Sequence, residues 1–396
     1  MVGTMSVVMY KKLGMPNEAI AFYTSWLTLP WVLKPLWSPG VDINGTKRGW
    51  IVGMETLMAA ALALVGLSLL SGHFFAPSLA LFFLTGVFSA THDIAADGFY
   101  MIGLTGHGQV WWSGLRNTFY RVAMTFGSGW LVLLAGHLET GKGDVPQAWC
   151  WTLLAASGLF FVGSVWHRFM LPRPARDGPV RLDRNWGAEF LATFGSFFRK
   201  PGVGLTLAFI LLYRLDEAQL SKVVPLFLLD KAGQGGLGLT TQQYGLAYGI
   251  YGVTALTCGG LAGGFLAAKY GLKRMLPVML AAMYLPKLAF IYLSCAQPRD
   301  FALICGAVTG EQFGYGFGFT AFMLYLLYFA RGPHQTAHYA LCTGFMTLGL
   351  MAPGLASGWL AEHLGYTRFF VWVFWSAGPG LIIALLLKID PEFGRR

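Results

Sequence analysis

Long apolar runs separated by short polar breaks occupy most of this chain. A helix that crosses a bilayer needs roughly 20 mostly apolar residues, whereas a half-buried strand would alternate apolar and polar positions. Runs of the required length lie at 18–37, 50–70, 77–103, 108–136, 147–171, 202–229, 241–268, 275–295, 300–330, 335–361 and 366–388. The pattern therefore predicts an all-α polytopic membrane protein with eleven full spans.

A shorter apolar segment, 1–10, precedes these spans and ends at Lys11 and Lys12. It has neither the leading charges nor the small-residue cleavage site of a signal peptide. Its Ser6-Val-Val resembles Ser221-Lys-Val-Val of the seventh span, where much more helix comes before the serine. We expect a first span whose cytoplasmic half is missing, either because the native chain begins upstream of Met1 or because the span is a genuine half-helix.

The longest polar break, 172–200, divides the chain near its middle. Within it, 186–198 carries apolar residues at helical spacing, which is typical of an amphipathic helix lying on a membrane surface; an ordinary solvated connector is the alternative. We therefore expect a helical bundle over 1–171 with spans one to six, a linker over 172–200, and a second bundle over 201–396 with spans seven to twelve.

A short turn motif occurs once in each half, 226 residues apart. The first copy contains Asp42, Gly45, Lys47 and Arg48, and the second contains Gly264, Ala268, Gly271, Lys273 and Arg274. In both copies a glycine stands three residues after the Asp42 or Ala268 position, and a basic pair follows at the fifth and sixth. A duplicated six-span half explains this repeat most simply.

Composition supports the membrane assignment and narrows the function. Charged residues are 12% of the chain against about 25% in soluble domains, and the mean hydropathy is +0.56. These values exclude a cytosolic enzyme, a nucleic-acid binder and a disulfide-built secreted module. The five cysteines show no metal-ligand spacing, so we expect no metal and no cofactor.

The basic residues predict the orientation. Sixteen of the 28 Lys and Arg residues lie on the side of the 172–200 linker, and six lie on the other side. Cytoplasmic loops carry the excess of basic residues, so the linker and the C-terminus are expected inside. The net charge of +10 is then mostly topology rather than a site for a polyanion.

Twelve spans with this turn motif resemble the major facilitator superfamily. The expected motif has Gly at Ser38 and, in the second copy, Asp at Ala268. The runs LPWVLKPLWSPGVD (29–42), KRGW (47–50) and ATHDIAAD (90–97) resemble its AmpG-type branch, although His92 replaces the usual Gln. The resemblance implies two six-helix bundles related by a pseudo-two-fold axis, in a bacterial inner membrane, and a cargo of anhydro-muropeptides, acyl-CoA or ferric siderophores.

Charged residues inside the spans mark candidate sites, because an ionised group at the bilayer centre costs about 2.5–3.5 kcal/mol. Asp93 and Asp97 share one face of the fourth span, and Arg116 and Arg121 enter the next span at similar depth. We expect an Asp–Arg network there. The family resemblance suggests that it joins Asp42, Lys47 and Arg48 as an inner gate; a proton site and plain packing are the alternatives.

The seventh span holds Arg214, Asp216 and Glu217, and Glu311 lies in the tenth. Carboxylates converging from these spans would form a proton and substrate site. Structural pairing with Lys222, Lys287 or Arg214 is the alternative. Three further expectations concern single residues: Lys34 snorkels to the inner surface, Lys287 has a carboxylate partner, and His334 and His338 lie at the surface.

These observations predict a proton-coupled secondary transporter that imports a polar sugar- or peptide-containing solute and works as a monomer in the lipid bilayer. Rocking of two bundles about a central site would move the solute. No Walker-type nucleotide motif is present in the sequence. A siderophore or acyl-CoA transporter is the alternative within the fold, and a membrane-embedded transferase using His92 and Asp93 is the alternative from another class.

Overall fold

The computed structural model describes residues 2–103, 119, 122–142, 144–175, 177–178, 186–331, 335–390 and 393, and these contain helices and connecting segments without a strand. The first helices are α1 (Val2–Lys12), α2 (Asn17–Trp26), α3 (Leu29–Ile43), α4 (Lys47–Ser68), α5 (Phe75–Gly103), η1 (Phe126–Trp130), α7 (Leu131–Lys142), α8 (Val145–Met170) and α9 (Trp186–Phe198). The later ones are α10 (Val203–Leu212), α11 (Leu215–Leu229), η2 (Ala232–Gln234), α12 (Thr241–Tyr244), η3 (Gly245–Gly252), α13 (Val253–Tyr270), α14 (Leu272–Tyr284), η4 (Leu285–Lys287), α15 (Leu288–Ala296), α16 (Phe301–Ala330), α17 (Gln335–Ser376) and α18 (Gly378–Leu386).

Eight helical stretches in the described part of the chain are long and apolar enough to cross a membrane. The last of them, 338–386, contains two predicted spans, because Gly365 adopts φ 73° and bends α17 there. The predicted second and seventh spans are each divided into two helices, α2 with α3 and α10 with α11. Pro30 has no amide hydrogen, which suits the first turn of α3, where the second span divides.

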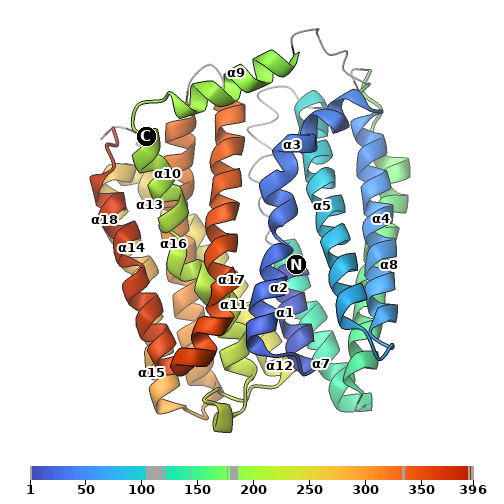
Figure 1. The fold of residues 1–396 in the computed structure, drawn as a ribbon, viewed down its shortest axis with the longest axis vertical. Helices are drawn as coiled ribbons and strands as arrows, with labels where there is room; N and C mark the ends of the chain where they lie inside the picture. The colour runs from blue at the N-terminus through green and yellow to red at the C-terminus, as the bar shows by residue number, and fades with distance from the viewer. Residues whose placement is uncertain are drawn as a thin grey trace.

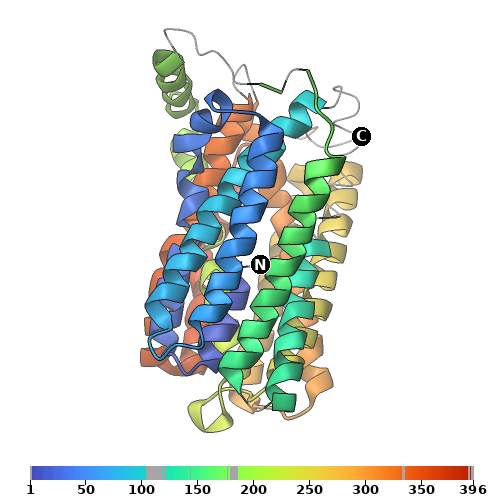
Figure 2. The same cartoon turned by 90° about the vertical axis from the view of Figure 1, so that its right-hand side faces the viewer.

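The helices form two groups that stand side by side (Figure 1). The N-terminal group contains α1–α5, α7 and α8, and the C-terminal group contains α10–α18. Helix α9 lies across one end of the molecule and covers the residues for which an amphipathic helix is expected. Figure 2 shows α4 and α8 running almost parallel along the length of the N-terminal group.

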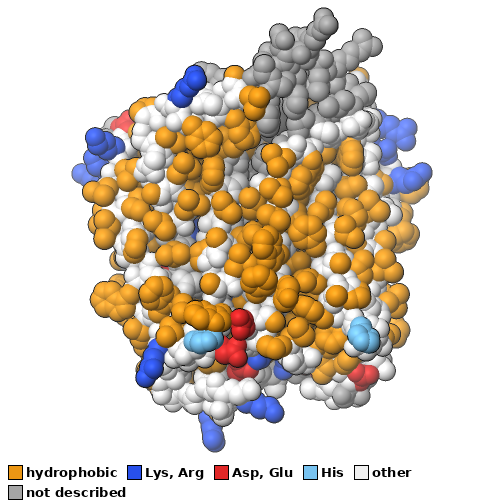
Figure 3. All heavy atoms as spheres, in the orientation of Figure 1, with side chains coloured by type: hydrophobic (Ala, Val, Ile, Leu, Met, Phe, Trp, Pro, Cys, Tyr) orange, Lys and Arg blue, Asp and Glu red, His pale blue; other side chains and the backbone are white. Residues whose placement is uncertain are grey.

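Apolar side chains cover the middle of the face in Figure 3, and charged side chains gather toward its two ends. Large apolar residues such as Phe169, Trp375 and Leu261 are more than two-thirds exposed. So large an exposed apolar surface is unfavourable in water, whereas it is favourable in contact with lipid chains. The chain is therefore a multi-pass membrane protein.

Both copies of the turn motif contain the glycine that the sequence predicts. Gly45 and Gly271 have φ values of 79° and 84°, in the left-handed region that other residues rarely adopt. Each glycine comes immediately before or close to the start of a helix, α4 or α14. The side chains of Lys273 and Arg274 in the second copy are exposed.

Glycines bring the two groups into close contact at the end opposite α9. A β-carbon on Gly249 of η3 would lie 2.3 Å from the Cα atom of Gly129 in η1, and one on Gly136 of α7 would lie 2.7 Å from the amide nitrogen of Gln242. Helix α17 approaches α2 in the same way, because a β-carbon on Gly358 would lie 2.6 Å from that of Ala21. Small residues are the usual means of close packing between membrane helices.

Replacing Gly249 with valine should lower the free energy of unfolding by about 1–3 kcal/mol or more, because the new side chain overlaps η1. Gly264→Val is the matched control, since no atom lies within 4 Å of its added β-carbon. Unfolding in a graded series of SDS-containing micelles, followed by circular dichroism, measures both. Equal stability of the two variants would contradict this role for Gly249.

Candidate functional site

The site begins at the break between α10 and α11. Arg214 departs from helical geometry, with φ −112° and ψ 20°, and α11 starts at the next residue. The Tyr284 hydroxyl donates a hydrogen bond of 3.1 Å to the carbonyl oxygen of Tyr213, and the Tyr213 hydroxyl donates one of 2.9 Å to the carbonyl of Gly318. These bonds from α14 and to α16 hold the break in place, so Asp216 and Glu217 lie in the first turn of α11.

Lys287 faces these two carboxylates from the C-terminal end of η4, where Pro286 interrupts the span between α14 and α15. Its ammonium forms an ion pair with Asp216 and lies 3.8 Å from Oε2 of Glu217. It also lies 5.0 Å from the ring centre of Tyr284, an attractive cation–π position. Asp216 has no exposed surface and Lys287 is 2% exposed, so this is a fully buried ion pair.

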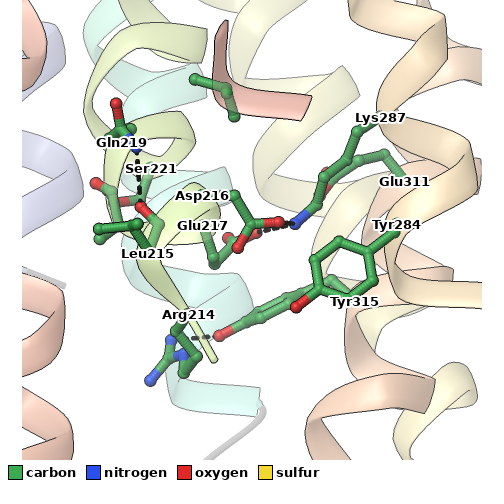
Figure 4. A network of polar contacts seen from close by, with 12 residues as sticks. Arg214, Leu215, Asp216, Glu217, Gln219, Ser221, Tyr284, Lys287, Glu311 and Tyr315 are labelled. Carbon is green, nitrogen blue, oxygen red and sulfur yellow. Dashed lines mark hydrogen bonds and ion pairs between the residues drawn. The ribbon is translucent and has the colours of Figure 1, made fainter. Parts of the chain in front are cut away.

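Glu311 of α16 completes the arrangement. It is 2% exposed, and its Oε2 atom accepts a hydrogen bond of 2.9 Å from the side-chain amide of Gln312. Its Oε1 atom and Oδ1 of Asp216 have no hydrogen-bond partner among the described residues. Figure 4 shows Asp216 and Glu217 pointing toward the Lys287 ammonium, with Glu311 beside the lysine.

Arg214 lies at the edge of this group. Its guanidinium donates to the hydroxyl of Tyr315 and stands 4.7 Å from the ring centre of Phe319. We call Arg214, Asp216, Glu217, Lys287 and Glu311 the central cluster. It contains three carboxyl groups and two basic groups, all of them buried.

The expected convergence of carboxylates from the seventh and tenth spans is therefore present in the structure, and the expected carboxylate partner of Lys287 is Asp216. Lys222 does not form the ion pair with these carboxylates that the sequence offers as an alternative. It points to α2 and donates a hydrogen bond of 3.1 Å to the Thr24 hydroxyl rather than to a carboxylate of the central cluster.

The predicted inner gate is described only in part. Arg116 and Arg121 lie outside the described residues, as does the side chain of Asp42. Asp93 pairs at 2.7 Å with Lys34, a partner other than the arginines expected for it. Asp97 lies one helical turn after Asp93 on α5.

Lys47 and Arg48 at the start of α4 are anchored within their own half. The Lys47 ammonium donates to the carbonyl of Val41 at 3.2 Å, and its side chain packs against Gly98 of α5. Arg48 donates to the carbonyls of Leu171 and Arg168 after and within α8. These contacts tie α4 to α3, α5 and α8, and the inner gate stays a proposal.

Two polar groups were missed in the sequence. Glu55 of α4 is bonded to Nδ1 of His167 at 2.8 Å and lies 3.3 Å from Nε2 of His92. A single acidic residue in an otherwise apolar helix is the signal that could have found it.

The outcome for the two histidines of the eleventh span is mixed. His338 is buried, contrary to expectation, and shares a hydrogen bond of 2.9 Å with Ser196 of α9, whereas His334 lies outside the described residues.

The second missed group joins the two helix groups at the end opposite α9. Asp230 after α11 forms an ion pair with Lys11 and accepts hydrogen bonds from Tyr366 and, at 2.8 Å, from the Asn17 side chain. Asn17 also accepts from Lys11 at 2.7 Å. We call Lys11, Asn17, Asp230 and Tyr366 the end network; it lines a hollow of about 580 Å³.

Two family models match the chain. The Major Facilitator Superfamily model matches residues 220–395, and the BT1 family model matches residues 1–107. Among solved structures, a variant of the nucleoside transporter NupG gives a TM-score of 0.69 at 14% identity, covering 97% of this chain and 94% of that one. A D-xylose-proton symporter gives 0.68 at 13% identity, covering 97% and 91%. At these identities the two structures show the fold.

Curated relatives point the same way. The chain is 32% identical to putative transporter AmpG 2 of Rickettsia prowazekii over half of its length, and the match spans only about half (47%) of that protein. It is 26% identical to putative transporter AmpG 4 of Rickettsia felis, over 91% of this chain and 86% of the relative. It is 25% identical to the anhydromuropeptide permease of Escherichia coli K12, over 96% and 74%.

These relatives are transporters and not enzymes, as the sequence predicts. The fold, the two family models and the named relatives agree with one another. The chain therefore has the fold of these solved transporters, matches the Major Facilitator Superfamily model over residues 220–395, and is similar to AmpG-type transporters.

Proposed function

We propose that the protein is a secondary transporter that imports a polar solute of the anhydro-muropeptide kind together with protons. The observation that carries this proposal is the central cluster, in which three buried carboxyl groups are accompanied by two buried basic groups, of which only Lys287 forms ion pairs with carboxylates among the described residues. Full ionisation would leave one negative charge without a partner in a region that lipid surrounds, which is unfavourable. A proton on one carboxyl group balances the charge, so the cluster is suited to take up and release a proton.

The solute assignment rests on the relatives, of which one is named an anhydromuropeptide permease. Transport would proceed by rocking of bundles 1–171 and 201–396, joined by linker 172–200, in a monomer whose linker and C-terminus face the cytoplasm of a bacterium. Asp42, Lys47, Arg48, Asp93, Asp97, Arg116 and Arg121 would form the inner gate. A broken helix at a buried charged site is typical of ion-coupled transporters.

A transferase reaction at His92 and Asp93 lacks support in the structure. His92 is directed to Glu55, and Asp93 is paired with Lys34, so the two adjacent residues have separate partners. They do not form a shared acid–base pair of the kind that group transfer requires.

Uptake into proteoliposomes tests the proposal. The purified full chain should accumulate a labelled anhydro-muropeptide when an inward proton gradient is imposed, and Asp216→Asn, Glu217→Gln and Glu311→Gln should each reduce gradient-driven accumulation at least about tenfold, in line with the contribution of positioned proton-transfer groups. Glu362→Gln, at an exposed position, is the control. Normal accumulation by all three cluster variants would exclude the cluster as the coupling site.

A further inference from the structure

Lys222 has an unusual environment for a buried lysine. It lies on α11 and is 9% exposed. Its ammonium carries three hydrogens, but the neutral Thr24 hydroxyl is its hydrogen-bond partner in the described part of the chain, at 3.1 Å. That hydroxyl already donates to the carbonyl of Ile20 at 2.6 Å, so it offers Lys222 an acceptor lone pair.

Comparison with Lys287 shows what Lys222 lacks. Lys287 is also buried, and it has the carboxylates of Asp216 and Glu217 within ion-pair distance. Lys222 has no such carboxylate among the described residues. A buried cation without a counter-ion is unfavourable, and an anion supplied from outside the protein would remove that penalty.

The position of Lys222 suits contact with a transported solute. Its bond to Thr24 links α11 in the C-terminal group to α2 in the N-terminal group. The aliphatic part of the Lys222 side chain also packs against a third helix, α17. A β-carbon added to Gly354 of that helix would lie 3.5 Å from the Lys222 Cγ atom. Along α11 Lys222 is five residues, or about 7.5 Å, beyond Glu217 of the central cluster.

We infer that Lys222 is the anion-recognition residue of this transporter and binds a carboxylate of the solute between the two helix groups. This inference rests on the proposed function. The solute carboxylate replaces the Thr24 hydroxyl as the main partner of the ammonium. Because the anion compensates Lys222 when it lies between the groups, its binding favours the conformation that encloses it.

Two probes that differ in one charge test this inference. N-acetylglucosaminyl-anhydro-N-acetylmuramic acid has one carboxylate, and its methyl ester has none. Counterflow in proteoliposomes loaded with unlabelled probe measures the half-saturating concentration of each without a proton gradient, which separates recognition from coupling. The wild type should favour the acid about tenfold or more, the value expected of a charge-assisted hydrogen bond.

Lys222→Gln should raise the half-saturating concentration of the acid about tenfold and leave that of the ester unchanged. Lys222→Arg should keep the preference for the acid, and Lys231→Gln, at an exposed lysine, should behave as the wild type. Uptake of the ester by Lys222→Gln shows that the variant is folded. Should Lys222→Gln fail to fold, the preference for the acid over the ester still tests the inference, because its absence from the wild type or from Lys222→Arg would contradict it.

The inference is overturned if the wild type takes up acid and ester with equal half-saturation, or if Lys222→Gln weakens both probes alike. In either case transport itself stands. Failure of the wild type to carry both probes would instead reject the proposed function, and the inference with it.

Discussion

Replacing Lys287 with methionine should lower the free energy of unfolding by about 3–5 kcal/mol, the range measured when one partner of a buried ion pair is removed. Methionine has a similar length, so packing changes little. Asp216, which has no exposed surface, would then lose its cationic partner, and Glu217 would lose its nearest one.

The double variant Lys287→Met with Asp216→Asn should regain most of this loss, because it removes the uncompensated charge together with the cation. Lys273→Met, at an exposed lysine of the second turn motif, controls for the loss of a positive charge and should change stability by less than about 0.5 kcal/mol. Unfolding in mixed SDS micelles measures all three. A double variant as unstable as the single one would show that Lys287 acts through something other than Asp216.

Span positions were predictable because apolar length is a property of the sequence alone. Helices α4, α5, α8 and α16 begin and end within a few residues of the predicted runs. The breaks inside the second and seventh spans were not, since the length of an apolar run does not show where its helix is interrupted. The break is fixed by the Tyr284 hydroxyl and by Gly318, which are distant in sequence.

The members of the central cluster were predictable for a related reason. A carboxylate in an apolar run is unfavourable unless it is paired or hydrated, so Asp216, Glu217 and Glu311 stand out in the sequence. Which lysine pairs with them depends on helix rotation and on the turn at Pro286, which sequence spacing does not give. Sequence analysis expects a carboxylate partner for Lys287 and names Lys222 as another possible partner; in the structure Lys287 pairs with Asp216, whereas Lys222 donates to Thr24.

Contacts between the two helix groups are the least predictable feature. The end network joins Lys11 to Asp230 and Asn17 to Tyr366, residues that are more than 200 positions apart. None of them lies deep in an apolar run, so the sequence does not mark any of them as a charged or polar group buried in the membrane. Their role depends on how the groups meet.

Replacing Asp230 with alanine should open the end of the molecule opposite α9. Asp230 is 4% exposed and receives Lys11, Asn17 and Tyr366 on one carboxylate, and hydrogen bonds to a charged group contribute about 1.5–3 kcal/mol each. Its loss removes the shared acceptor of three side chains, two of which belong to the N-terminal group. Separation of the groups at this end should then become at least about tenfold more frequent.

Thiol labelling measures this opening. Ser25→Cys, in a background whose natural cysteines are replaced, places a thiol at a fully buried position between α2 and Gly354 of α17. A membrane-impermeant maleimide should label it at least about tenfold faster when Asp230 is alanine. Asp300→Ala is the control, because that carboxylate caps α16 and does not join the two groups. Equal labelling rates with and without Asp230 would show that the glycine contacts of α2 with α17 and of η1 with η3, rather than the end network, keep this end closed.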